Sequence, residues 1–136
     1  MFTSKGIIRY NDDEGFRLTL EVNQEFSNYY RALIPKYYKV KKPRWPAHVT
    51  VVRPELENPP RIRYWGDYEG KSIEFLYDPY IQCDKGFYWL NIWCKQLEVI
   101  RAELGLENVS KYPLLPAGYF KTFHCTIGNY EENLPV

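Results

Sequence analysis

Two separate stretches of the chain alternate apolar and polar residues with the period of two that is typical of a β-strand. Both contain the same phrase: His48-Val49-Thr50-Val51 within residues 47–53, and His124-Cys125-Thr126-Ile127 within residues 121–128. Successive side chains on a strand point to opposite faces, so the histidine and the threonine of each phrase share a face. We therefore predict that the chain is organised around two imidazole–hydroxyl pairs, formed by its only two histidines.

The rest of the pattern predicts further strands and two helices. Alternation predicts strands over residues 5–10, 15–22, 72–78 and 86–93, with polar residues 11–15 joining the first two as a hairpin. Helical spacing of apolar residues predicts helices over 24–34 and 94–104. Asn23 is the expected N-cap of the first helix and Pro35 its end, while Gly105 ends the second.

The predicted helices each carry an apolar stripe, and the segments between elements are less regular. The stripes consist of Phe26, Tyr29, Tyr30 and Leu33 in the first helix, and of Leu97, Ile100 and Leu104 in the second. Residues 54–60 are turn-rich, and the aromatic residues 61–69 lack clean periodicity, which indicates a short strand or an aromatic loop. We expect a loop over 106–120 and a short polar tail from Tyr130 to Val136.

The order of these elements predicts the fold class. The chain reads strand, strand, helix, strand, and then strands, helix, strand, so each half ends in a histidine-threonine strand after a helix. This order favours a single α+β domain over residues 1–136 with mainly antiparallel sheet. If a pseudo-two-fold axis relates the halves, the two pairs face each other across a central cleft.

Composition narrows the partners and the compartment. Eighteen basic and seventeen acidic side chains leave no net field of the kind that drives non-specific binding to nucleic acid or to membranes. The aromatic content of 18% offers faces on which flat ligands stack. Three cysteines without C-x-x-C spacing argue for a reducing compartment and against disulfides or a zinc site. With no leader-like N-terminus or spanning apolar run, we expect a cytoplasmic protein that does not bind membranes.

A basic segment interleaved with aromatic residues, 36–45, precedes the first phrase. Charge runs usually face water, so a solvated loop is one interpretation. The alternative is a nucleotide contact, in which Lys42 and Arg44 bind phosphate oxygens and Trp45 stacks on a base. Cys125 is interpreted as a core residue, since alternation turns it away from His124.

The two phrases, in a small α+β chain, resemble the 2H phosphoesterase superfamily. Within this superfamily the chain resembles the phage anti-CBASS nucleases most. Two stretches carry this resemblance: Gly6-Ile7-Ile8-Arg9-Tyr10 and the run from Arg44 to Arg53. The resemblance implies a bilobal fold with a central cleft, and metal-independent cleavage of ribonucleotide phosphodiesters without a cofactor. It implies catalytic roles for His48, Thr50, His124 and Thr126. The implied substrates are the cyclic oligonucleotides by which bacteria signal infection. If the chain is of phage origin, the implied compartment is the host cytoplasm.

These residue types suit that chemistry. One histidine takes the proton of a ribose 2′-hydroxyl that attacks the neighbouring phosphorus, and the other protonates the departing 5′-oxygen. The threonines donate hydrogen bonds to the phosphate oxygens. Which histidine is the general base and which the general acid stays open. The nucleobase preference and the oligomeric state also stay open. The segment beyond Asn129 is short for the lid that the family pattern includes, so what caps the cleft also stays open.

Substrate contacts are expected from residues near the phrases and from the aromatic set. They are Tyr10, Trp65, Lys121 and Thr122. The near-neutral charge favours a compact cyclic oligonucleotide over long RNA. Two alternatives remain: a 2′,3′-cyclic phosphodiesterase acting on RNA ends with the same histidines, and a nucleotide-binding module without catalysis.

Overall fold

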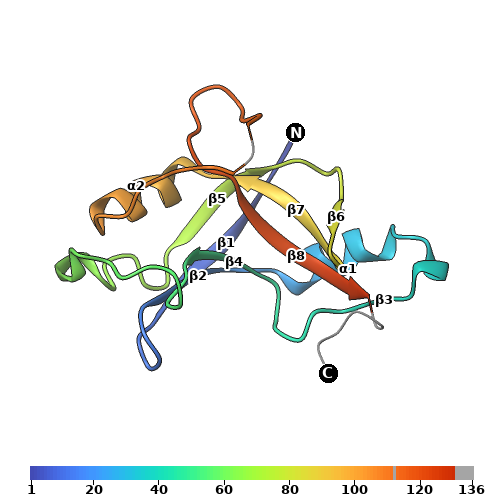
Figure 1. Ribbon diagram of the computed structural model, residues 1–136, viewed down its shortest axis with the longest axis horizontal. Helices are drawn as coiled ribbons and strands as arrows, with labels where there is room; N and C mark the ends of the chain where they lie inside the picture. The colour runs from blue at the N-terminus through green and yellow to red at the C-terminus, as the bar shows by residue number, and fades with distance from the viewer. Residues whose placement is uncertain (112, 131–136) are drawn as a thin grey trace.

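The computed structural model describes residues 1–111 and 113–130, and eight strands and two α-helices make up about half of them (Figure 1). The strands are β1 (Phe2–Asn11), β2 (Arg17–Val22), β3 (Val40–Lys41), β4 (His48–Val52), β5 (Ser72–Tyr77), β6 (Gln82–Asp84), β7 (Phe87–Trp93) and β8 (Phe123–Tyr130). The α-helices are α1 (Gln24–Ala32) and α2 (Lys95–Glu103), and single 3-10 turns lie at Lys36–Tyr38 and Ile62–Tyr64.

The strands form one sheet in the order β3-β8-β4-β2-β1-β5-β7-β6. Because β8 also pairs with β7, six strands close into a barrel, with β3 and β6 paired at its margins. Every pairing between these strands is antiparallel. Figure 1 shows α1 and α2 at opposite ends of the view, with β7 and β8 side by side between them. The predicted α+β class with mainly antiparallel sheet is confirmed.

The two strands that carry the His-x-Thr phrases, β4 and β8, are here called the motif strands, and their histidines and threonines the motif residues. Each motif strand buries one face in the core. Val49, Val51, Cys125 and Ile127 are at most 2% exposed, as the prediction for Cys125 requires. Burying an aliphatic side chain contributes roughly 1.5–3 kcal/mol. The core therefore fixes the register of β4 and β8, because a slip by one residue would turn these side chains out and the histidines in.

The strands form where alternation predicts them, with shifts at their ends. The hairpin pairs β1 with β2 from Gly6–Val22 to Asn11–Arg17, and β1 begins early because its first half also pairs with β5. Tyr130 belongs to β8, so its assignment to a polar tail is wrong; residues 131–136 of that tail lie outside the described residues. The short strands β3 and β6 were not predicted, since two or three residues carry no alternation.

The two helices differ in how well their sequence predicts them. Asn23 caps α1 by accepting the Glu25 N–H at 2.9 Å, but the helix ends at Ala32 because the chain tightens into i→i−3 bonds before Pro35. Its stripe is half wrong: Tyr30 is buried, whereas Tyr29 and Leu33 are 61% and 57% exposed.

The second helix matches its prediction closely. The stripe of α2 is buried throughout, at Leu97, Ile100 and Leu104. Gly105 ends the helix with φ +84°, which a glycine adopts without strain. No helix in the described part of the chain is long and apolar enough to cross a membrane.

Residues 61–69 form the aromatic loop, and the strand alternative is wrong. Their backbone bonds are local, with Tyr64 N–H donating to Arg61 O and Trp65 N–H to Ile62 O, so the segment coils through a 3-10 turn. Trp65 of this loop packs against the hairpin instead of entering the sheet. Its ring lies edge-on to those of Tyr10 and Phe16, with 4.9 and 5.0 Å between the ring centroids.

Candidate active site

The two motif strands are neighbours in the sheet. β4 and β8 run antiparallel with Val49 paired to Cys125. Extending this antiparallel register by one residue to either side places His48 opposite Thr126 and Thr50 opposite His124. Directly paired residues share a face, so all four side chains form one cluster on the face that the core leaves free. They lie side by side on adjacent strands, which differs from the expected arrangement on two facing walls.

The antiparallel pairing sets the spacing of the cluster. His48 and His124 occupy diagonal positions of the antiparallel pair, whose Cα atoms are about 7–8 Å apart. Each imidazole has the threonine of the other phrase directly across from it. A group bound between the rings therefore meets one imidazole from each strand and a hydroxyl from each strand.

Both motif strands carry a β-bulge at the same place. On β4, Thr50 pairs with Thr19 and Val52 with Leu18, so Val51 is the extra residue. On β8, Thr126 pairs with Trp89 and Gly128 with Tyr88, so Ile127 is the extra residue. Each bulge follows the motif threonine by one residue, and bulges of this kind re-aim side chains beside functional sites.

Each bulge is held by an arginine from a helix of the other half. The Arg101 guanidinium on α2 donates to the Val51 carbonyl at 2.7 Å, and the Arg31 guanidinium on α1 donates to the Ile127 carbonyl at 3.1 Å. Arg101 is 2% exposed and also forms a two-pronged ion pair with Glu57, at 2.9 and 2.6 Å. These bonds satisfy carbonyls that a bulge leaves unpaired.

The next strands widen the polar face. The second cross-strand neighbours of the four motif residues are Glu21 beside His48, Thr19 beside Thr50, Asn91 beside His124 and Trp89 beside Thr126. Trp89 donates its indole N–H to the Asn91 side chain at 3.0 Å. The motif cluster is thus flanked on the β7 side by an aromatic ring that a hydrogen bond holds in place.

His48 is held in one orientation. Its Nδ1 lies 2.8 Å from the Pro46 carbonyl oxygen, which can only accept a hydrogen bond, so Nδ1 carries a proton. Nε2 is then the nitrogen left for chemistry. Because the bond is to a backbone two residues away, the ring orientation is fixed locally by the entry into β4.

His124 is held neutral by its surroundings. Burial lowers its pKa to about 4, and the nearby charges of Arg53, His48 and Lys121 act in the same direction. At neutral pH the imidazole therefore has a free lone pair.

Two pockets meet at His124 and Arg53. The first, of about 460 Å³, is here called the basic pocket; its lining includes Thr50, Arg53, Lys111, Lys121, Thr122 and His124. The second, of about 440 Å³, is called the aromatic pocket, lined by Arg53, Asp84, Lys85, Phe87, Trp89, His124 and Thr126. Both are large enough for part of a small ligand. His48 lines neither pocket and lies at the margin of the cluster.

The residues expected to bind substrate divide into two groups. Lys121 and Thr122 line the basic pocket beside His124. Tyr10 and Trp65 line neither pocket: they pack against each other, and the Tyr10 hydroxyl accepts the Tyr68 N–H at 3.3 Å. Burial raises the pKa of Tyr10 to about 12.

The basic segment also lies apart from these pockets. Lys42, Arg44 and Trp45 line neither of them, and Trp45 is 70% exposed. This placement agrees with the solvated-loop interpretation of the segment.

Sequence reasoning missed Arg53 and Trp89 as site residues. Arg53 directly follows β4, and this position is the only signal in the sequence that could have identified it. Trp89 lies in a strand that was predicted, yet nothing in the sequence pairs that strand with the second phrase. Among the described residues, no three histidine, cysteine or acidic side chains group into a metal site.

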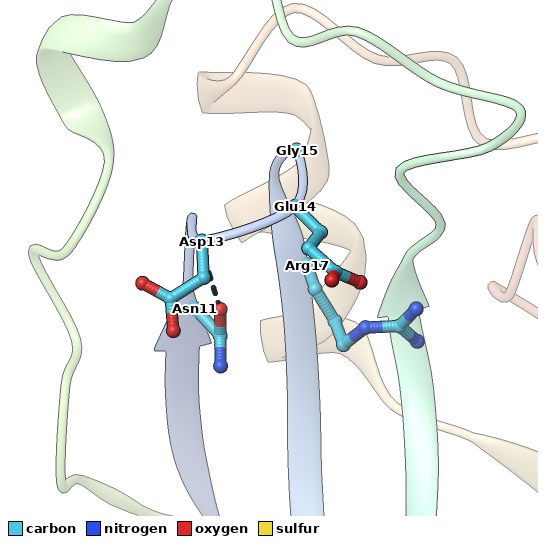
Figure 2. Close-up of a pocket in the computed structure, with 5 residues that line it drawn as sticks. All are labelled: Asn11, Asp13, Glu14, Gly15 and Arg17. Carbon is cyan, nitrogen blue, oxygen red and sulfur yellow. Dashed lines mark hydrogen bonds between the residues drawn. The ribbon is translucent and has the colours of Figure 1, made fainter.

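A third hollow, of about 220 Å³, lies in the β1–β2 hairpin (Figure 2). Its lining is Asn11, Asp13, Glu14, Gly15 and Arg17. Figure 2 shows the Asn11 side chain turned back to accept the Asp13 N–H, at 3.0 Å, which is an ordinary turn contact. No motif residue lies here, so we place the candidate site at the histidine cluster.

Comparison of the chain with models of protein families, with curated proteins and with solved structures finds no match. A functional proposal therefore rests on the geometry and chemistry of the site.

Proposed function

We propose that the protein is a phosphodiesterase of the two-histidine type, which cleaves the bond between phosphorus and a ribose 5′-oxygen with the neighbouring 2′-hydroxyl as nucleophile. The observation that carries the proposal is the pairing of Val49 with Cys125. This register gathers two imidazoles and two hydroxyls into one cluster from the only two histidines of the chain.

A pseudo-two-fold relation between the halves supports the proposal. The order β1-β2-α1-β4 matches β5-β7-α2-β8, and the pairing β4-β2-β1 matches β8-β7-β5. The bulges after Thr50 and Thr126, each bonded to an arginine of the opposite helix, follow the same relation. The axis passes between Val49 and Cys125, so a two-lobed fold of the 2H type is the interpretation we favour.

The two histidines have different roles in this mechanism. His124, neutral because of its low pKa, takes the proton from the 2′-hydroxyl. The 2′-oxygen bonds to phosphorus, the bond to the 5′-oxygen breaks, and His48, which enters this step as the imidazolium with protons on both nitrogens, gives its Nε2 proton to that oxygen. The product is a 2′,3′-cyclic phosphate. Water that gives its proton to His48 can then open this ring, while His124 returns its proton to the leaving 2′-oxygen.

The threonines stabilise charge on the phosphate. Thr50 and Thr126 lie opposite the two histidines, where their hydroxyls can donate to the non-bridging oxygens as negative charge builds on them. Each proton-transfer group is expected to contribute roughly 10²–10⁴ in rate. No metal ion or cofactor is part of the proposal.

As substrate we propose cyclic di- or trinucleotides with a 3′–5′ linkage, the bacterial immune signals that anti-CBASS enzymes degrade in the host cytoplasm. The aromatic pocket supports a nucleotide ligand, because Phe87 and Trp89 offer ring faces beside Thr126. The near-balanced charge suits a compact ligand better than long RNA. Cleavage of RNA ends that carry a 2′,3′-cyclic phosphate is the second candidate, since the same histidines suffice for it.

The test incubates the purified chain with cyclic dinucleotides and trinucleotides, and separately with RNA ending in a cyclic phosphate, all in EDTA. Cleavage of the cyclic oligonucleotides alone supports the first substrate, and cleavage of RNA ends alone supports the second. A cyclic dinucleotide made of 2′-deoxynucleotides is the matched control, since it lacks the nucleophile and must stay intact. His48→Asn and His124→Asn should each reduce turnover at least a hundredfold. Tight binding without turnover, or loss of activity in the chelator, would contradict the mechanism.

A further inference from the structure

The basic pocket is lined by more cations than carboxylates. Besides His124 it is lined by Arg53, Lys111, Lys121 and Arg101, with Glu57 as its one carboxylate. Glu57 is engaged by Arg101, whose guanidinium it meets at 2.9 and 2.6 Å. In the described residues no carboxylate lies within ion-pair distance of the other three cations.

Lys121 is the centre of this unbalanced charge. Burial lowers its pKa, and the charges of Arg101, Arg53 and Lys111 lower it further, against the opposite effect of Glu57. The ammonium group therefore lies half-buried among other cations. Nearby like charges raise the free energy of the charged form, and an anion in the pocket would offset that cost.

A buried carboxylate on α2 fixes the backbone at Phe120 and Lys121, at the edge of the pocket. Glu98 is 5% exposed, and its Oε2 accepts the backbone N–H groups of Phe120 and Lys121 at 2.9 and 3.1 Å. The Lys121 ammonium donates to the Val109 carbonyl at 3.4 Å. These bonds position the lysine before any ligand arrives, so binding costs little side-chain ordering.

We propose that the basic pocket binds a second phosphate group of the substrate through Lys121, Arg53 and Lys111, while the scissile phosphate lies at the histidine cluster. This inference rests on the proposed function and narrows its substrate. The site then selects ribonucleotides that carry at least two phosphates, such as a cyclic dinucleotide, over dinucleoside monophosphates that carry only the scissile one.

The experiment compares cyclic di-adenylate with the dinucleoside monophosphate ApA as substrates of the wild type and of Lys121→Met. A charge-assisted hydrogen bond contributes about 1.5–3 kcal/mol, so the variant should raise KM for the cyclic dinucleotide roughly tenfold or more. For ApA the KM should change less than about twofold, because ApA places no second phosphate in the pocket; kcat is compared separately, since the charge of Lys121 also lowers the pKa of His124. Lys5→Met, at an exposed position of β1 outside both pockets, is the matched control for loss of one charge.

A second measurement separates failure of the pocket from failure of the proposed function. Binding of inorganic pyrophosphate is followed by calorimetry, and Lys121→Met should weaken it by about the same factor. If Lys121→Met changed the KM of both nucleotides equally, or left pyrophosphate binding unchanged, the second phosphate site would be overturned even if cleavage occurs. Lysine-dependent pyrophosphate binding by a chain that cleaves neither nucleotide would refute the phosphodiesterase and leave an anion site.

Discussion

The ionisation of His124 is the property of the site that a single substitution changes most directly. Burial, then the charge of Arg53, then those of His48 and Lys121 lower its pKa to about 4. Replacing Arg53 with glutamine removes the largest of the charge effects and keeps a polar side chain of similar length. We expect the pKa of His124 to rise in this variant while staying below that of an ordinary histidine, because burial persists.

The magnitude follows from the same causes. The gap between an ordinary histidine pKa near 6.5 and about 4 corresponds to roughly 3 kcal/mol between the two protonation states. Burial accounts for the largest share, so the effect of Arg53 is smaller than that of burial. We therefore expect a rise on the order of one pKa unit or less on its removal.

The assay is an NMR titration of ¹³C-labelled histidine side chains between pH 3.5 and 8, a range that covers the His124 pKa of about 4 and the ordinary histidine value of 6.5. The chain has only two histidines, so His48→Asn leaves a single imidazole signal and assigns it. Lys5→Met serves as the control for a lost charge outside the pockets. A wild-type His124 that titrates near 6.5, or an Arg53→Gln variant with unchanged titration, would refute the electrostatic account of the site.

The low pKa also predicts how stability depends on pH. Between about pH 6.5 and pH 4 the unfolded chain binds a proton at this histidine that the folded chain does not, so the free energy of unfolding falls as the pH is lowered through this window. The loss at this one group should reach roughly 3 kcal/mol. Urea unfolding measured across these pH values should show that the free energy of unfolding depends less steeply on pH in His124→Asn than in the wild type. Equal slopes would contradict the prediction.

Three further substitutions test the site and the sheet that carries it. Arg101→Met leaves Glu57 without its ion-pair partner and the Val51 carbonyl without its donor. Urea titrations should show a free energy of unfolding lower by about 3–5 kcal/mol. Adding Glu57→Gln should recover part of this loss. Thr126→Val should lower kcat about 10²–10³-fold in steady-state assays while the melting temperature changes little, because it removes one donor to the phosphate. Gly6→Ala places a methyl group 2.5 Å from the Glu21 carbonyl across the β1–β2 pair and should cost about 1–3 kcal/mol of stability in thermal or urea unfolding; an unchanged melting temperature would show that the strands can separate without cost.

The features that the sequence by itself determined are local ones. Alternation around His48 and His124 identified two strands and the face on which each histidine meets its threonine, because side-chain direction on a strand follows from backbone geometry alone. Asn23 and Gly105 marked helix ends for similar reasons, since capping and a positive φ depend on one residue and its neighbours. The order of the main elements along each half followed from these local signals.

The tertiary structure alone decided which strands meet and in what register. The pairing of Val49 with Cys125 joins distant parts of the chain, and its register depends on which side chains the shared core buries. The same packing brings Arg53 and Trp89 to the histidines and lowers the pKa of His124. Burial and electrostatic fields are sums over neighbours from many elements, so no short stretch of sequence contains them, whereas the direction of a side chain along its own strand needs only that strand.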